Sequence, residues 1–189
     1  MAGVKELQAK GIRAAAFAAD VSEPKASVAL AAKVKAELGP IGAVHFNAYL
    51  GDAGDVLEAD PAVLGRVVNV AVVGLTGLVQ AALPDLKEAK GSVLVTNGGL
   101  GLLDAGVEGY TVQGKTMGLA IANAAKHKLV RLLNARLKAD GVYVGEVMVT
   151  TAVKGTSWDN GSATLEASTV AEKFWQLHSE RRELSVLVP

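Results

Sequence analysis

The chain has 189 residues, no cysteine, and 19 acidic side chains that balance 19 basic ones. The zero formal charge argues against a nucleic-acid-binding surface, and the absence of cysteine excludes disulfides, thiolate nucleophiles and cysteine-bound zinc. Half of the residues are hydrophobic but only 4% are aromatic, so small aliphatic side chains must form the core.

Helical and extended patterns alternate along the chain. Gly11 closes a first helix, Gly39-Pro40 stops a second, and Pro84 is expected to end the third. Thr169 and Glu172 have the spacing of a capping box, which marks the start of the last helix. The expected elements are a helix over residues 3–10, a strand over 12–18, a helix over 22–38, a strand over 43–47, a helix over 60–83, a strand over 92–96, a helix over 110–138, a strand over 142–149, a helix over 169–179 and a strand over 184–188.

Strands that alternate with helices predict an α/β fold with a parallel sheet. We expect about five strands with flanking helices, as three layers or as an open-faced sheet, in one domain over residues 1–189. No glycine-rich strand-to-helix turn precedes the first strand, although such a turn holds the pyrophosphate in Rossmann domains. The sequence therefore predicts a Rossmann-like sheet that lacks the first strand–helix–strand unit.

The apolar run over residues 67–83 is interrupted by Asn69, Thr76 and Gln80. This pattern predicts a buried helix rather than a membrane span. The first residues are too polar for a signal peptide, so we expect a cytoplasmic protein without a membrane partner.

Several short motifs follow one another in a recognisable order. Asp20-Val21 follows the first expected strand, Asn47-Ala48 follows the second, and Asn69 lies between two valines in the long apolar helix. Residues 91–95 (GSVLV) form the third strand, and residues 126–149 (KHKLVRLLNARLKADGVYVGEVMV) form a helix and a strand. Together these segments resemble the short-chain dehydrogenase/reductase family, from that family's third strand onward.

The resemblance implies a nicotinamide dinucleotide, NAD or NADP, as cofactor. It places Asp20 against the adenine ring, and it implies that Val21, Asn47, Ala48 and Thr150 also contact the cofactor. Because the glycine-rich turn is absent, the pyrophosphate has no obvious anchor. A structural role stays open for Asp20, which could cap the following helix, and for Asn47, which could hold a turn.

The family's chemistry uses a tyrosine as general acid/base, a lysine that lowers the tyrosine pKa, a serine that binds the carbonyl, and an asparagine in a proton relay. The resemblance assigns the relay to Asn69, the acid/base role to Tyr110 and the cation to Lys115 or Lys126. Asn97 stands at or next to the serine position, so the sequence predicts an incomplete tetrad.

Neither alignment gives a tyrosine and a lysine on one helix face, which requires a spacing of four residues. Tyr110 and Lys115 are five apart, and the residue four before Lys126 is Ala122. Structural roles are open here as well. Asn69 in its apolar helix needs a hydrogen-bond partner, and Asn97 with the two following glycines could form a plain turn or offer N–H groups to an oxyanion. The three histidines do not form a ligand set, so no metal is expected.

Three functions are compatible with these patterns. The first is an NAD(P)-dependent oxidoreductase that acts on a small carbonyl or alcohol, as the resemblance implies. The second is a cofactor-independent isomerase, dehydratase or lyase on the same scaffold, and the third is a non-catalytic binding subunit.

A sheet without its first strands is expected to carry the main helices on one face. The bare face then needs a cover, either a partner subunit or residues 1–10. The resemblance implies a homodimer or homotetramer through the two long helices, and their small residues suit close packing. The small residues meant are Ala71, Gly74, Gly77, Ala81, Gly118, Ala120 and Ala124.

Overall fold

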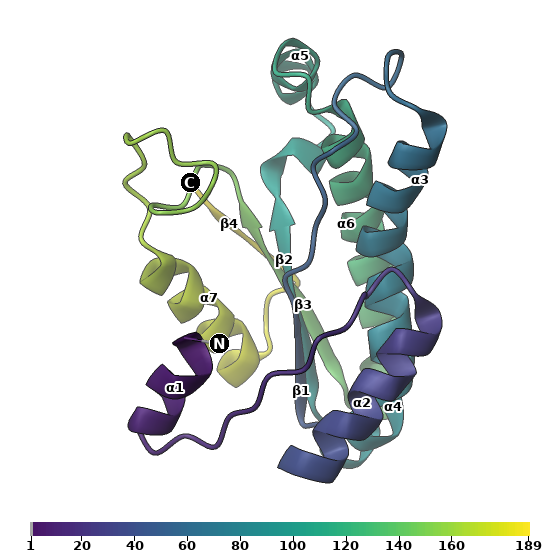
Figure 1. Ribbon diagram of the computed structural model, residues 1–189, viewed down its shortest axis with the longest axis vertical. Coiled ribbons are helices and arrows are strands. Elements are labelled where there is room, and N and C mark those ends of the chain that lie inside the picture. Colours follow the sequence, from purple (N-terminus) through teal and green to yellow (C-terminus); the bar gives the residue numbers. More distant parts are fainter. Residues whose placement is uncertain (1) are drawn as a thin grey trace.

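A parallel sheet of four strands forms the centre of the computed structural model, which describes residues 2–189 (Figure 1). The strands lie in the order β1-β2-β3-β4, and every neighbouring pair is parallel. Their bounds are β1 Ala43–Phe46, β2 Ser92–Gly98, β3 Tyr143–Val149 and β4 Ser185–Val188. The α/β fold with a parallel, open sheet is therefore confirmed.

Helices connect the strands and account for most of the remaining regular structure. A long helix over Pro61–Glu88 contains a π-helical stretch, so its parts carry separate labels. The helical elements are α1 Ala2–Ala9, α2 Pro24–Leu38, α3 Pro61–Val68, the π-helix Asn69–Gly74, α4 Leu75–Glu88, the 3₁₀ turn Gly99–Gly101, α5 Ala105–Gln113, α6 Met117–Leu137, the 3₁₀ turn Lys138–Asp140 and α7 Ala167–Glu180.

One face of the sheet packs against α4 and α6, and α2 packs against α4 (Figure 1). Alternate strand residues point to this face, because successive side chains of a strand point to opposite sides. Val93, Val95 and Val144 are fully buried here against Leu75 of α4 and Val130 of α6. This cluster is the main hydrophobic core.

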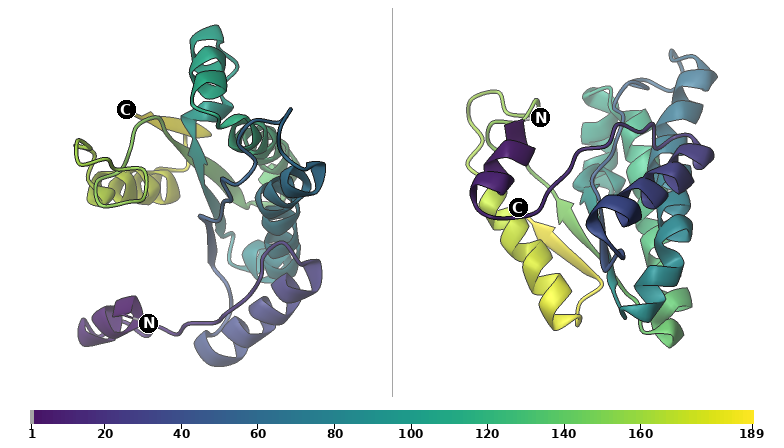
Figure 2. Two further views of the ribbon diagram at one scale, coloured as in Figure 1. Left: turned by 45° about the horizontal axis from the view of Figure 1, so that its top comes forward. Right: turned by 60° about the horizontal axis from the view of Figure 1, so that its bottom comes forward.

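The other face packs against α7, and Figure 2 shows α7 on the opposite side of the sheet from α2, α3, α4 and α6. Phe174 and Leu177 of α7 are buried against Leu94, Tyr143 and Val147. The expectation that all main helices share one face was wrong, because α7 returns to the other side before β4. Segment 1–10 does not supply the expected cover, since residues 5–10 are exposed; Met1 lies outside the described residues.

The predicted strand over residues 12–18 was wrong. This segment is irregular and largely exposed, with Ile12 at 50% (Figure 1). It does not pair with β1, the nearest strand in sequence. A strand needs a neighbour to satisfy its backbone N–H and C=O groups, and no described strand pairs with this segment. The sheet therefore has four strands rather than about five.

Two predicted helix boundaries also differ from the structure. The long helix continues through Pro84 to Glu88, because Pro84 lies on the exposed side, where water can bind the freed carbonyl. The capping box at Thr169 is not used, since α7 begins at Ala167 without a side-chain cap.

The predicted helix over residues 110–138 is two helices, α5 and α6, separated by Gly114, Lys115 and Thr116. Lys115 has a φ of +50° there, a left-handed conformation that ends a helix. The expected single helix was wrong for that reason.

Two glycines expected in a subunit interface pack inside the chain instead. A Cβ on Gly74 would lie 2.8 Å from the carbonyl oxygen of Val21, and a Cβ on Gly118 would collide with the carbonyl oxygen of Ala53. These positions need glycine because a loop crosses each helix closely. The oligomer remains a prediction, and these two glycines are explained by packing within the chain.

Among the described residues, one helix, Pro61–Glu88, is long and apolar enough to cross a membrane by length and composition. A core helix of a soluble protein passes the same test. Leu75, Val79 and Leu86 of this helix are buried in the main core, so it packs as a core helix.

Candidate functional site

An open cleft of about 830 Å³ lies beside the carboxyl end of β1. One wall is the loop that precedes α2, and the other is the segment that follows β1, with the long helix at its side. The lining residues are Ala18, Ala19, Asp20, Val21, Ser22, Ala48, Tyr49, Leu50, Asp52, Arg66 and Val70. Three residues predicted to bind the cofactor, Asp20, Val21 and Ala48, are thus brought together.

Asp20 presents an ionised carboxylate to this cleft. Its Oδ1 accepts hydrogen bonds from Ser22 N at 2.9 Å and Ser22 Oγ at 2.7 Å. These bonds hold the pKa of Asp20 below its ordinary value. The helix-capping role considered for Asp20 is not seen, because Glu23 is the residue before α2 and Asp20 bonds only within its own turn.

The opposite wall carries an aromatic and a cationic side chain that the sequence analysis missed. Tyr49 is half-exposed, and its hydroxyl accepts a hydrogen bond from Trp158 Nε1 at 3.0 Å. Trp158 belongs to the segment between β3 and α7, where Asp159 accepts three backbone N–H groups and shapes the turn. Arg66 is exposed at the side of the cleft and supplies a positive charge.

Asn69 is the first residue of the π-helical stretch and follows Val68, the last residue of α3, on the long helix beside the cleft. Its side chain is exposed, so the expectation that Asn69 needs a hydrogen-bond partner within the protein was wrong. The helix turns Asn69 outward, while Val70 and Ala71 point inward and are buried. A π-helical turn inside an α-helix is frequent at functional sites, which draws attention to Asn69.

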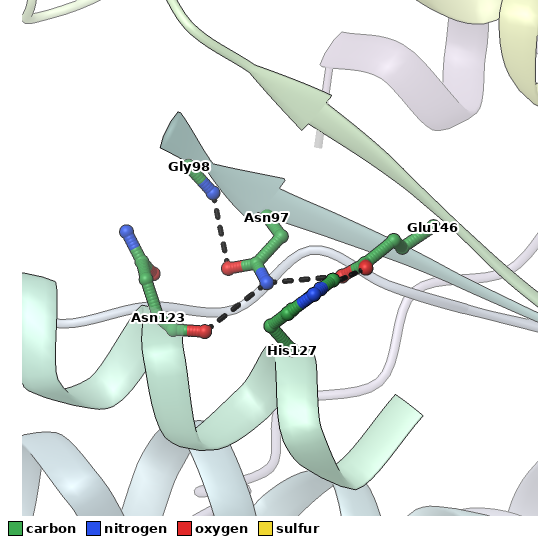
Figure 3. A network of polar contacts seen from close by, with 5 residues as sticks. All are labelled: Asn97, Gly98, Asn123, His127 and Glu146. Carbon is green, nitrogen blue, oxygen red and sulfur yellow. Dashed lines mark hydrogen bonds and ion pairs between the residues drawn. The ribbon is translucent and has the colours of Figure 1, made fainter. Parts of the chain in front are cut away.

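A second cluster of polar groups lies between β2, β3 and α6, on the face of the sheet that α4 and α6 cover (Figure 3). Glu146 of β3 is fully buried, and its carboxylate accepts hydrogen bonds from Asn97 Nδ2 at 3.0 Å and from His127 Nδ1. Asn97 Nδ2 also donates to the backbone oxygen of Asn123 at 3.2 Å, and Asn97 Oδ1 accepts Gly98 N–H at 3.0 Å. The amide of Asn97 is therefore engaged within the protein.

The candidate acid/base residue and the two candidate cations lie in different surroundings. Tyr110 is 66% exposed on α5, which projects beyond the end of the sheet (Figures 1 and 2). Lys115, between α5 and α6, pairs with Glu58 at 3.0 Å, and this bond raises the Lys115 pKa. Lys126 of α6 is buried near Glu146, and burial lowers its pKa to about 8.

The remaining predicted residues have simple placements. Asn47 is exposed just after β1. Thr150, just after β3, donates through its N–H and its hydroxyl to the carbonyl of Val188, at 2.9 and 3.2 Å. Thr150 thus ties the end of β3 to β4.

A family model described as short chain dehydrogenase matches residues 1–157 of the chain. The chain belongs to the short-chain dehydrogenase family. No curated protein matches the sequence.

Solved structures with the same fold cover nearly the whole chain. A blue fluorescent protein from a metagenomic library, in complex with NADPH, has a TM-score of 0.84 and 21% identity over 99% of this chain and 79% of its own. A metagenomic short-chain oxidoreductase in complex with NADP gives 0.78 and 20%, over 99% and 77%. An alcohol dehydrogenase from the archaeon Thermococcus sibiricus, complexed with 5-hydroxy-NADP, gives 0.79 and 19%, over 97% and 77%.

The family assignment leaves the individual site residues as predictions. In this chain the amide predicted at or next to the serine position, Asn97, donates to the buried carboxylate of Glu146. Glu146 and His127, which complete that network, are not among the residues predicted from the sequence. The sequence does contain a signal for this network. A single glutamate stands in the apolar strand sequence YVGEVMV, and a carboxylate in a buried strand needs hydrogen-bond partners.

Proposed function

We propose that this chain is an NAD(P)-dependent oxidoreductase that acts on a small carbonyl or alcohol, and that its open cleft holds the adenosine part of the cofactor. The observation that carries the proposal is the meeting of residues 18–22 with residues 48–52 across one cleft. These are the two segments in which the family resemblance places the cofactor contacts.

The chemistry of the cleft fits an adenosine phosphate. Ala18, Ala19 and Ala48 leave room and an apolar surface for a flat ring. The Asp20 carboxylate can accept a hydrogen bond from the adenine amino group. Arg66 is the one cationic side chain among the described residues that line the cleft, so it is the candidate partner for a phosphate.

The bound cofactor would supply the hydride chemistry, and the chain's own residues would bind and orient the reactants. The solved relatives hold NADPH or NADP, which agrees with a cofactor of this class. Asn69, beside the cleft on the same helix as Arg66, is the candidate for holding a proton-relaying water, and Tyr110 remains the candidate acid/base.

A second candidate function is nucleotide binding without turnover. It is favoured by the internal engagement of the Asn97 amide and by the exposure of Tyr110 on α5. Neither side chain contacts Lys126 through a hydrogen bond in the part of the chain that the structure describes. This arrangement leaves the binding cleft intact while it separates the catalytic groups.

Titration with NADPH and NADH, followed by tryptophan fluorescence, tests the proposed function. Trp158 reports on the cleft through Tyr49, and a Trp175→Phe background removes the other tryptophan, which lies on α7. We expect micromolar binding that Arg66→Ala weakens about tenfold, whereas Arg131→Ala on the exposed side of α6 leaves it unchanged. Absence of binding at millimolar cofactor would remove both candidate functions.

Turnover separates the two candidates. NADPH oxidation with small aldehydes and ketones is expected for the oxidoreductase, and Tyr110→Phe should lower its kcat. Tight NADPH binding without oxidation across such a panel would favour the binding subunit.

A further inference from the structure

The side chain of Asn123 has an unusual position on α6. The residue is 4% exposed, and its backbone oxygen accepts the Asn97 Nδ2 hydrogen bond. Its own side-chain amide forms no hydrogen bond with any residue over 2–189. Figure 3 shows this amide directed toward Gly98 at the end of β2, with no interaction drawn to it.

The amide is largely buried but keeps some contact with solvent. Within the described part of the chain, the side-chain polar atoms that are fully buried and lack a hydrogen-bond partner are the hydroxyl oxygens of Ser27, Thr111 and Ser185. The amide of Asn123 is not among them, so part of it stays accessible. A largely buried amide without a partner destabilises a fold, because it loses hydrogen bonds to water and gains none. A ligand atom that reaches the amide would satisfy it.

Gly98 provides the space in which the amide lies. A Cβ on Gly98 would lie 2.6 Å from Asn123 Nδ2, closer than a real contact allows. The amide therefore occupies the volume that any larger residue at position 98 would need. Because Gly98 is the last residue of β2, this is the carboxyl end of the parallel strands, where open α/β sheets bind their ligands.

The backbone that carries this amide is tightly packed and bonded. The turn Gly99–Gly101 presses on α6 so closely that a Cβ on Gly101 would lie 2.6 Å from Ala124 N. The Asn97 amide bonds both the Asn123 backbone and the buried Glu146, which joins this turn of α6 to β2 and β3. A donor carried by such a backbone needs little reorganisation when it meets a charge or a dipole.

We propose that the Asn123 side-chain amide donates a hydrogen bond to the oxygen of a small carbonyl or alcohol substrate at the carboxyl end of β2. The inference rests on the proposed function for its substrate class. Asn123 is then a catalytic residue that neither the family motifs nor the spacing of the sequence indicates. Gly98 is required beside it, since a side chain there would displace the amide.

The test uses cyclohexanone as a carbonyl probe and the full chain without cofactor. In the native protein, the side-chain NH₂ resonances of Asn123 are expected to shift on titration, and Asn123→Leu identifies them by their loss. Asn123→Leu keeps a similar volume, so its urea midpoint should equal or exceed the native one while cyclohexanone binds at least tenfold more weakly. The matched control is Asn134→Leu on the same helix. Asn134 Nδ2 donates to Val144 O at 2.9 Å, so this variant should lose stability and keep its cyclohexanone affinity.

Two results would overturn the proposal: no shift of the Asn123 NH₂ resonances in the native chain at saturating cyclohexanone, or unchanged probe affinity in folded Asn123→Leu. The native measurement does not depend on whether the variant folds. NADPH binding is measured separately by fluorescence, so a failure of the cofactor proposal is distinguishable from a failure at Asn123.

Discussion

The free energy of unfolding should rise as the pH rises above neutrality, because the buried Lys126 side chain then loses its charge. The side chain is 2% exposed on α6, and burial lowers its pKa from 10.5 to about 8, although attraction to Glu146 partly opposes that change. Below pH 8 the folded protein carries this buried charge at a cost. Between pH 8 and 10.5 the folded protein has released the proton while the unfolded chain still holds it, so the cost disappears.

The size of the effect follows from the two pKa values. At about 1.4 kcal/mol per pKa unit, the difference between 10.5 and about 8 corresponds to about 3 kcal/mol. At pH 9.5 the unfolded chain is still mostly protonated at this site, so about 2 kcal/mol of the gain should appear between pH 7 and pH 9.5. Stability therefore rises with pH across this window.

Urea unfolding at several pH values from 7 to 9.5 measures this rise. The native chain should gain about 2 kcal/mol in free energy of unfolding. Lys126→Met should be more stable than the native chain at pH 7 and nearly independent of pH, since Glu146 keeps its bonds from Asn97 and His127. Lys128→Met, at an exposed position of the same helix, should follow the native curve. A native stability that stays level or falls over this range, or a Lys126→Met variant that keeps the slope, would refute the reasoning.

Two further predictions concern packing and the alkaline limit. Burial raises the pKa of Tyr143 to about 12, so the free energy of unfolding should fall as the pH rises from 10 to 12. Tyr143→Phe should remove that fall. The same variant should lose about 1 kcal/mol at neutral pH, because the Tyr143 hydroxyl donates to Glu183 O at 2.6 Å. Urea unfolding at both pH values checks this, and an unchanged alkaline fall in the variant would contradict it. Leu75→Ala should cost about 2–5 kcal/mol, because Leu75 is fully buried, whereas Leu57→Ala, at 92% exposure, should change stability by less than about 0.5 kcal/mol. Equal losses in the two variants would contradict the assigned core.

Local chemistry made much of the fold predictable. Pro24 at the start of α2 and Gly39 at its end act through neighbouring backbone atoms, so the predicted helix over 22–38 has the correct end and begins two residues early. The continuous apolar strands with helices between them predicted a parallel sheet, which the structure has. The segment over 12–18 was misjudged because its composition is that of a strand, while strand formation depends on a neighbour that local sequence does not reveal.

The candidate site was harder to predict, because its parts meet only in the folded chain. The family motifs indicated Asp20 and Ala48 as cofactor contacts, and both line the cleft. Tyr49 and Arg66 carry no local signal that distinguishes them from ordinary surface residues. Asn123 is one polar residue on a helix with several others, and nothing in its sequence neighbourhood reports an amide without a partner.

The order of strands and helices, the apolar core positions and the family were determined by the sequence itself, because spacing and composition act over a few residues. The tertiary structure alone decided that α7 covers the second face, that α5 and α6 separate at Lys115, and that Glu146 joins Asn97 to His127. Each of these depends on contacts between residues far apart in the chain. Such contacts are fixed by the burial of surfaces and by the pairing of polar groups across elements, and no local pattern encodes them.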